Sequence, residues 1–318
     1  MDGRRSPTNG DRRREKQAGN GSPPRRSIPE THGDSSPRPA GGPPFSGQPH
    51  LGGSRAQDPA VARLAAGDLE TVEAYLQPKV RLSDRAIVGA ELLARWRHPE
   101  KGIVGPDQFL PLLLGHRHTR ALLARMLDQA ADALDRFGDT VPAGWTLSIN
   151  ADRRDLEAAD FTDWFLRQLE RRSLDPARLT IEITETSLVH QRRKLHAVLR
   201  RLRNSGLHIS LDDYGTGYAS LSDIQRLPLT ELKVDRSFVS EVTRRQRHRI
   251  ILQSTAELAR ALNLAVVAEG IEDRRTAEVC VELGCGYGQG YVFARPMPLA
   301  AFTDLLVTSG GRLQPNTD

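Results

Sequence analysis

The sequence predicts an α/β barrel of the (β/α)8 type, and three observations support this fold class. Short apolar runs rich in β-branched residues recur through the last two-thirds of the chain, separated by segments with helical spacing. These runs are apolar enough to be buried on both faces, as the strands of a parallel sheet are. Six of them also carry or end in a polar residue suited to chemistry, as expected at the rim of such a barrel: WTLSIN, LTIEIT, LHISLDD, TELKVD, AVVAEG and YGQGYVF.

The first 60 residues differ in composition from the rest. They contain 10 of the 20 prolines and 10 of the 27 glycines. Because such a segment buries too little apolar surface to offset its ordering entropy, we expect a disordered tail over 1–60 and one barrel domain over 61–318. The tail has 10 Lys+Arg against 6 Asp+Glu, so it carries +4 of the total charge of +5. The nearly neutral barrel argues against a DNA or RNA substrate.

The basic clusters of the tail are able to contact phosphate or an anionic surface, although a solvated tail is the simpler interpretation and no tail partner is indicated. No apolar run reaches the roughly 20 residues of a membrane span, and no signal-peptide core follows the N-terminus. We therefore expect a soluble, cytoplasmic protein. Its two cysteines, Cys280 and Cys285, are best interpreted as small buried apolar residues.

The predicted barrel opens with a hairpin rather than with a strand–helix repeat. Residues 72–80 alternate like a strand, 82–85 form a turn, and 86–96 form a second strand. An antiparallel strand is therefore expected at the start of the barrel. Gly-Pro-Asp at 105–107 interrupts the regular structure and precedes apolar positions at helical spacing. A longer helix is expected over 119–137.

Beyond this point strands and helices alternate. Strands are expected at 145–150, 179–184, 207–212, 230–234, 264–269 and 287–293, and helices at 153–172, 187–204, 219–227, 246–262, 273–283 and 299–307. With the opening hairpin this makes eight strands over about 240 residues, the usual size of a single barrel.

The polar residues of these strands form an oxygen-rich set without histidine or cysteine, which suits Mg²⁺ or Mn²⁺ better than zinc. Adjacent carboxylates at one strand end, Asp212 and Asp213, are able to bridge two ions. Two ions about 3.5–4 Å apart serve displacement at phosphorus. Lys233 supplies a positive charge near the attacking water or the phosphoryl oxygens. The full set is Glu91, Asn150, Glu182, Asp212, Asp213 and Glu269.

Each of these residues also has a structural explanation when it is considered alone. Taken alone, Glu91 fits an acid inside the barrel that is capped or paired with another side chain. Asn150, taken alone, fits a residue that closes a turn. Either Glu182 or Glu185 is able to cap the following helix, and Glu185 is the better placed. The aspartate pair before a glycine-rich loop is often a turn, whereas the lysine in a short apolar strand requires a partner. Because all these explanations would have to hold together, a metal-dependent phosphotransfer or hydrolysis site is the better interpretation.

In this order, the motifs resemble those of the EAL-domain family of cyclic-di-GMP phosphodiesterases over about residues 70–308. The family's Glu-Ala-Leu-Leu-Arg-Trp motif is similar to Glu-Leu-Leu-Ala-Arg-Trp at 91–96. Its Asp-Asp-Phe-Gly-Thr-Gly loop is similar to Asp-Asp-Tyr-Gly-Thr-Gly at 212–217. Further matches are Tyr-Leu-Gln-Pro at 75–78, Glu-Ile-Thr-Glu at 182–185, Lys233, Glu-Gly at 269–270 and Gln-Gly at 289–290.

The resemblance implies a distorted TIM-like barrel that opens cyclic-di-GMP to linear pGpG with two Mg²⁺ or Mn²⁺ ions, and it implies a homodimer. The implied ligands of one ion are Glu91, Asn150, Glu182 and Asp212, and those of the second are Asp212, Asp213 and Glu269. The implied catalytic residues are Lys233, Glu269, Glu91 and Gln289, and the implied substrate-binding residues are Gln77, Leu93, Arg95 and Asp213. The residues that would link the site to a dimer interface are Glu185, Gly215 and Gly217.

Three positions depart from the family pattern without removing a metal ligand. Leu92 replaces alanine, Tyr214 replaces phenylalanine, and Asp152 replaces a serine. We expect Asp152 to cap the helix that follows it. The complete ligand set favours an active hydrolase, and the alternative is a receptor that binds cyclic-di-GMP without cleaving it. A protein-interaction scaffold would leave the acids at the rim unexplained.

Overall fold

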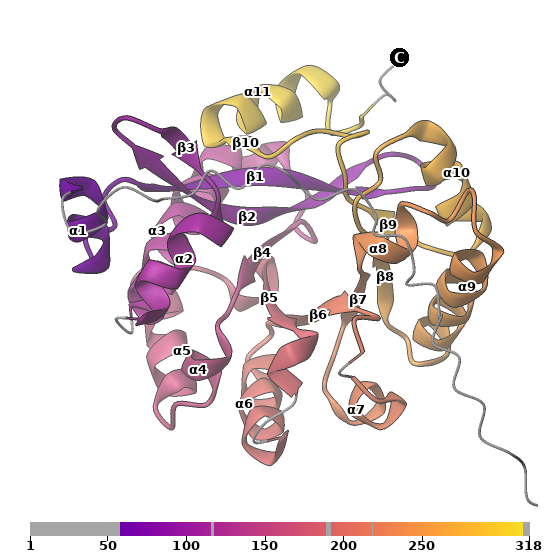
Figure 1. Cartoon of the computed structure of the whole chain (residues 1–318), viewed down its shortest axis with the longest axis horizontal. Helices are drawn as coiled ribbons and strands as arrows, with labels where there is room; N and C mark the ends of the chain where they lie inside the picture. The colour runs from indigo at the N-terminus through magenta and orange to yellow at the C-terminus, as the bar shows by residue number, and fades with distance from the viewer. Residues whose placement is uncertain (1–57, 116–117, 189–191, 218, 314–318) are drawn as a thin grey trace, which may run out of the picture. The chain divides into compact units, whose positions relative to one another are not determined.

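A closed eight-stranded barrel forms the centre of the protein (Figure 1). A computed structural model describes residues 58–115, 118–188, 192–217 and 219–313. Around the barrel the strands are β1 (Val72–Arg81), β2 (Ile87–His98), β4 (Thr146–Asn150), β5 (Leu179–Thr184), β6 (His208–Tyr214), β7 (Glu231–Val234), β8 (Ala265–Ala268) and β9 (Tyr287–Gly288), which pairs again with β1. The predicted fold class is confirmed.

Strand β1 is the expected antiparallel strand. It forms a hairpin with β2, in which Gln77 lies opposite Glu91, and it pairs in the antiparallel sense with β9 on its other side. From β2 to β9 the barrel strands are parallel. The carboxyl ends of β2 and of the following strands therefore meet at one end of the barrel, and this is where the predicted polar residues lie.

The closing strand is shorter than predicted over 287–293. Strand β9 ends at Gly288, after which the chain wraps around Ile271, whose backbone N–H donates to the Gln289 carbonyl at 3.1 Å and whose carbonyl accepts from Val292 N–H at 3.1 Å. A Cβ on Gly290 would lie 2.1 Å from the Ile271 carbonyl oxygen, so only glycine permits this close approach. Two further short strands extend the sheet, β3 (Gly102–Val104) beside β2 and β10 (Met297–Pro298) beside β1.

Most predicted helices lie where the sequence placed them. They are α2 (Pro106–Gly115), α3 (Thr119–Phe137), α6 (Arg192–Asn204), α7 (Leu221–Arg226), α9 (Gln246–Ala261), α10 (Arg274–Glu282) and α11 (Leu299–Ser309). The part of the 187–204 prediction before α6 is a 3₁₀ turn, Glu185–Leu188, followed by residues 189–191, which lie outside the described residues. A four-residue helix not predicted from the sequence, α8 (Arg236–Val239), follows β7, and 3₁₀ turns occupy Gly138–Thr140 and Pro176–Arg178.

The single helix predicted over 153–172 is wrong, because two helices occupy this segment. They are α4 (Arg153–Leu156) and α5 (Phe161–Arg171). Leu156 and Phe161 are both fully buried. On one continuous helix, positions five residues apart differ by roughly 140° around the axis, so the break allows both side chains to reach the core.

The domain begins earlier than its composition suggested. Pro59 and Ala60, which the sequence prediction placed in the tail, belong to helix α1 (Pro59–Ala65). Asp58 caps this helix by accepting from Ala60 N–H at 3.0 Å, and its other oxygen lies 2.9 Å from His98 Nε2. Helix α1 packs against α2 and the β2–β3 hairpin in a small second core that includes Trp96 and Phe109. The rest of the predicted tail, residues 1–57, lies outside the described residues.

The main core fills the barrel and the layer between its strands and the helices. An aromatic group of Phe137, Trp145 and Phe302, with neighbouring ring centroids 5.3–6.3 Å apart, joins α3 and α11 to the start of β4. Cys280 and Cys285 are buried free thiols, as expected. These contacts hold the strands in a fixed register and so fix the positions of the side chains at their ends.

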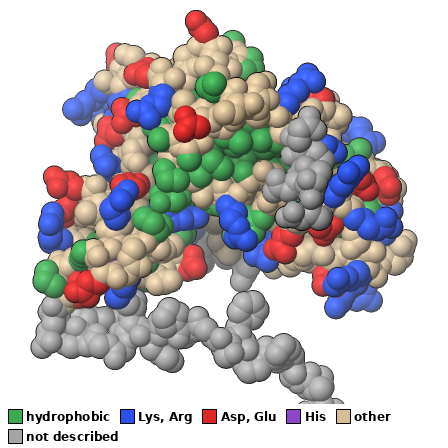
Figure 2. All heavy atoms as spheres, turned by 90° about the horizontal axis from the view of Figure 1, so that it is seen from above, with side chains coloured by type: hydrophobic (Ala, Val, Ile, Leu, Met, Phe, Trp, Pro, Cys, Tyr) green, Lys and Arg blue, Asp and Glu red, His purple; other side chains and the backbone are tan. Residues whose placement is uncertain are grey.

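The surface shows charges of both signs. Figure 2, which looks from above onto the face of Figure 1 that carries α11, shows hydrophobic side chains gathered near the middle and acidic and basic side chains interspersed around them. In the described part of the chain, no helix is both long enough and apolar enough to cross a membrane.

Candidate active site

Lys233 of β7 lies at the centre of the acidic site. Its side chain is 1% exposed, and its Nζ contacts four carboxylates from four other segments. A single positive charge thus faces four acids, and the surplus of negative charge is buried at the carboxyl end of the barrel. Burying unbalanced charge is costly unless cations are bound there. The distances are 3.2 Å to Glu91, 2.8 Å to Glu182, 3.1 Å to Asp212 and 2.8 Å to Glu269.

Amide side chains hold Glu91 in place. Asn150 at the end of β4 donates through Nδ2 to Glu91 Oε1 at 3.0 Å, and Gln289 donates through Nε2 to Glu91 Oε2 at 2.7 Å. Gln289 Nε2 also donates to Gln77 Oε1 at 3.1 Å. The antiparallel register of β1 and β2, which sets Gln77 opposite Glu91, makes this chain of hydrogen bonds possible.

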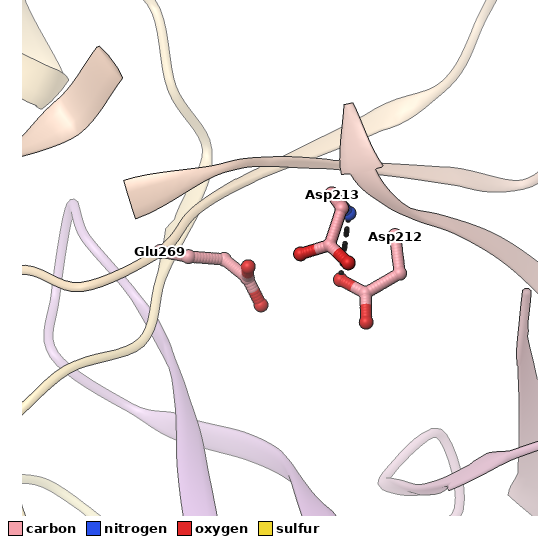
Figure 3. Close-up of side chains that lie close together, drawn as sticks. All are labelled: Asp212, Asp213 and Glu269. Carbon is pink, nitrogen blue, oxygen red and sulfur yellow. Dashed lines mark hydrogen bonds between the residues drawn. The ribbon is translucent and has the colours of Figure 1, made fainter. Parts of the chain in front are cut away.

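The two adjacent aspartates face the same end of the barrel because the backbone leaves the extended conformation between them. Successive side chains of a strand normally point to opposite faces. Asp213 has φ +56°, in the left-handed region, and the register between β6 and β7 shifts between Leu211 and Tyr214. Figure 3 shows the carboxylates of Asp212, Asp213 and Glu269 turned toward one another, and their ligand oxygens lie within 4.8 Å of one another. A strained non-glycine residue of this kind is common at functional sites.

The pKa values of the acids reflect burial and mutual repulsion. Burial, reinforced by the charge of Asp212, raises the pKa of Asp213 to about 6. Burial raises the pKa of Glu269 to about 8 despite the opposing charge of Lys233. Glu182, beside Glu91, has its pKa raised well above the usual value by burial and by that neighbour. The pKa of Glu91 itself is lowered, because the lysine and the amide donors outweigh its burial.

The donor set fits divalent metal ions that prefer oxygen. It consists of carboxylates and one amide oxygen, it carries excess negative charge, and it has at its edge a group of three carboxylates close enough to share an ion. Mg²⁺ and Mn²⁺ match such ligands, whereas zinc sites usually include histidine or cysteine.

Glu185 stabilises the loop that follows β6. Its Oε2 accepts from Thr216 Oγ1 at 2.7 Å and from Gly217 N–H at 3.1 Å, and its Oε1 accepts from Ala219 N–H. Gly215 has φ +111°, and a Cβ there would lie 2.5 Å from the Phe238 ring. Glu185 therefore holds this loop, which its interpretation as a simple helix cap did not include.

A groove of about 520 Å³ lies beside the acids. Leu93, Asn150 and the two aspartates contribute to its lining. Arg95 does not line it: Arg95 Nη1 donates to the Ala94 carbonyl at 2.9 Å, and its guanidinium lies 6.0 Å from the Tyr75 ring centroid. The predicted residues therefore separate into a cluster around Lys233 and a more distant arginine.

Two arginines that were not predicted as site residues line the same groove, Arg153 and Arg154. Arg153 forms an ion pair with Glu157 at 2.6 Å. Asp152 caps α4 by accepting from Arg154 N–H at 2.8 Å, as expected for this departure from the family pattern. The signal available in the sequence was a pair of adjacent arginines three and four residues after Asn150, but assigning them to a long helix concealed their position at the rim.

Comparisons with known proteins agree with the motifs. The sequence model of the EAL domain matches residues 62–296. The chain is 36% identical over 224 residues to the Pseudomonas aeruginosa protein named bifunctional diguanylate cyclase/cyclic di-GMP phosphodiesterase MucR, covering 70% of this chain and 33% of MucR. It is 34% identical over 253 residues to cyclic di-GMP phosphodiesterase RocR of the same organism, covering 78% of this chain and 64% of RocR. The chain thus spans only a third to two-thirds of these curated relatives.

Solved structures also resemble this chain over most of its length. The MucR phosphodiesterase in complex with c-di-GMP superposes with a TM-score of 0.72 at 33% identity, covering 76% of this chain and 99% of that one. The EAL domain of Mycobacterium smegmatis DcpA superposes with a TM-score of 0.66 at 26% identity, covering 76% of this chain and 100% of that one.

Proposed function

The chain belongs to the EAL-domain family, and from this premise we propose that it is a phosphodiesterase that hydrolyses cyclic-di-GMP to linear pGpG. Relatives named cyclic di-GMP phosphodiesterase and a superposable c-di-GMP complex support the substrate class. The observation that carries the proposal is the surplus of buried carboxylates around Lys233 at the barrel rim. A receptor that only binds the dinucleotide has no need of this surplus.

Two Mg²⁺ or Mn²⁺ ions would be held by the carboxyl ends of the strands. When bound, such ions activate water and neutralise charge on the phosphoryl and leaving oxygens. Glu91, Asn150, Glu182 and Asp212 would hold one ion, and Asp212, Asp213 and Glu269 would hold the other.

The side chains of the protein position these groups. Gln289 and Asn150 orient Glu91 through hydrogen bonds to both of its oxygens, so its carboxylate is fixed before substrate arrives. The Lys233 ammonium stays charged because the surrounding carboxylates raise its pKa well above the usual value despite burial. It therefore provides a permanent positive charge beside the attacked phosphate and the attacking water.

Recognition of the substrate phosphates would involve arginine. Arg95 lies on β2 four residues beyond Glu91, and its guanidinium is able to form two parallel hydrogen bonds to a phosphate. Leu93 would contact the nucleotide from the groove, and Gln77 would lie nearer the substrate than Gln289 does. Glu185, Gly215 and Gly217 would relay the state of the β6 loop to a partner subunit in a homodimer.

The direct test is incubation of the purified full chain with cyclic-di-GMP in Mn²⁺ or Mg²⁺, followed by nucleotide chromatography. We expect pGpG to accumulate and a chelator to abolish its formation. Binding of cyclic-di-GMP without any pGpG after prolonged incubation in Mn²⁺ would identify a receptor instead.

A further inference from the structure

A second polar pocket lies at the amino-terminal end of the barrel, opposite the acidic site. Its volume is about 590 Å³, within the range of small-molecule sites. Every strand of the barrel contributes to its lining, at the amino end of each parallel strand and near the carboxyl end of the antiparallel β1. Its lining includes polar side chains from six of these strands: Lys79, Thr146, Thr180, His208, Glu231 and Tyr287.

The floor of this amino-terminal pocket is a buried ion pair. Lys79 Nζ donates to Glu231 Oε2 at 2.7 Å, and the two residues are 6% and 7% exposed. Glu231 Oε1 is buried and has no hydrogen-bond partner among the described residues. A buried carboxylate oxygen left unpaired is costly, so this atom favours a ligand that donates a hydrogen bond. Glycine at position 89 permits the close approach of β4, because a Cβ there would lie 2.6 Å from the Thr146 carbonyl oxygen and 3.3 Å from Lys79 Cε.

The walls of the pocket add a cation and apolar surfaces. Arg203 of α6 lines it, as do Leu229 and Leu262. Among the lining residues that the structure describes, Glu231 is the one carboxylate, so two cations, Lys79 and Arg203, face a single acid. The pocket therefore has surplus positive charge, the reverse of the acidic site, and attracts an anionic group.

We propose that this pocket binds a nucleoside monophosphate, with the edge of its base on Lys79 and Glu231 and its phosphate on Arg203. An ammonium only donates hydrogen bonds and an ionised carboxylate only accepts them. The adjacent Lys79 and Glu231 thus match the hydrogen-bond acceptor and donor that lie side by side on the Watson–Crick edge of a nucleobase. The leucines and Tyr287 contact the ring, and the guanidinium pairs with phosphate. This site stands apart from the acidic rim, so it does not depend on the function proposed there.

The test is calorimetric titration of the full chain with GMP, AMP, CMP and UMP in turn, with inorganic phosphate as a separate arm. We expect at least one nucleotide to bind and phosphate alone not to displace it. Arg203→Ala should weaken binding by about tenfold or more, the usual effect of losing a hydrogen bond to a charged group. Arg201→Ala is the matched control, because Arg201 lies on the same helix but pairs with Asp163 at 2.6 Å and does not line the pocket.

Glu231→Gln tests the floor of the pocket, since it removes the charge of the unpaired acceptor. Circular dichroism checks that this variant folds, and the comparison of the two arginine variants decides the question if it does not. The proposal is overturned if none of the four nucleotides binds at millimolar concentration. It is also overturned if Arg201→Ala and Arg203→Ala weaken binding equally, or if phosphate alone competes as well as the nucleotides, which would indicate a simple anion site.

Discussion

The two ends of the barrel each bury a lysine, but they balance its charge in different ways. At the amino end, Lys79 contacts one carboxylate, Glu231, and the charges of the pair cancel. At the carboxyl end, Lys233 contacts four carboxylates, and the negative charge is in excess. A balanced pair needs no added cation to remain buried, whereas an unbalanced cluster requires added cations. The balance of charge therefore separates the two ends more clearly than burial does.

This difference predicts opposite responses to the loss of one acid. Glu231→Ala leaves Lys79 buried without its partner and should lower the free energy of unfolding by about 3–5 kcal/mol. Glu182→Gln in the presence of a chelator leaves three carboxylates around Lys233 and relieves repulsion, so it should cost far less. Urea denaturation measures both variants.

The control is the double variant Lys79→Met/Glu231→Leu, which replaces the ion pair by apolar side chains and should recover most of the stability lost in Glu231→Ala. An equal loss of unfolding free energy in Glu231→Ala and Glu182→Gln would contradict the excess of negative charge around Lys233. It would mean that groups other than these contacts balance the charge at the rim.

Loss of the rim lysine should affect the rate more than binding. Lys233→Ala keeps every proposed metal ligand but removes a positioned charge, so turnover of cyclic-di-GMP should fall about 10²–10³-fold. Hydrolysis in Mn²⁺ and calorimetric binding in Ca²⁺ separate the two effects. Lys194→Ala, an exposed lysine on α6, is the matched control and should hydrolyse at the wild-type rate. A wild-type rate in Lys233→Ala would make this lysine purely structural.

Metal ions should stabilise the carboxyl end. At a concentration 100 times the dissociation constant, a bound ion adds about 2.7 kcal/mol to the free energy of unfolding. Mg²⁺ or Mn²⁺ should therefore raise the Tm of the wild type, and Glu91→Ala should lose most of this increase and lower the rate of hydrolysis. Calcium should bind but inhibit, because its longer bonds and looser geometry misplace the attacking water. A hydrolysis rate in Ca²⁺ equal to that in Mg²⁺ would contradict the two-ion site.

The rim was largely predictable from the sequence because each of its residues lies on, or directly after, a strand with a strong local pattern. Asn150, Glu182 and Lys233 lie on strands whose apolar periodicity fixes their end of the barrel. The left-handed backbone at Asp213 and the break between α4 and α5 were not predicted, because tertiary packing produces them and local propensity does not.

The ion pair of Lys79 and Glu231 at the floor of the amino-terminal pocket was not predicted, for a different reason. Lys79 and Glu231 are 152 residues apart in sequence, and nothing near either residue indicates the other. The requirement of a buried strand lysine for a partner holds for Lys79 as it does for Lys233. It would have predicted the existence of a pair but not the identity of the acid.

A smaller effect is expected for the two acids that Arg120 contacts, Asp155 and Asp160, because they differ in burial. Arg120 Nε lies 3.7 Å from Asp155, whose other carboxylate oxygen, Oδ2, is buried without a hydrogen-bond partner among the residues that the structure describes. Arg120 Nη1 lies 2.8 Å from the exposed Asp160. Burial raises the pKa of Asp155, whereas the hydrogen bond from Arg120 lowers that of Asp160. Asp155 is thus a partly balanced buried acid, intermediate between the two ends of the barrel.

The sign of the pH dependence follows from these directions. A raised pKa in the folded state means that Asp155 favours folding when protonated, and this contribution is lost as pH rises above the ordinary value of about 3.9 and through the folded pKa. Asp155→Asn should therefore be more stable than the wild type at pH 7, by about 1 kcal/mol at most, and the gain should shrink toward pH 4. Asp160, whose pKa is lowered, contributes stability above pH 3.9, so Asp160→Asn should show no gain at pH 7. Urea denaturation at pH 4, 5.5 and 7 measures both variants, and a pH-independent gain in Asp155→Asn would show that packing, not charge, sets the cost of this residue.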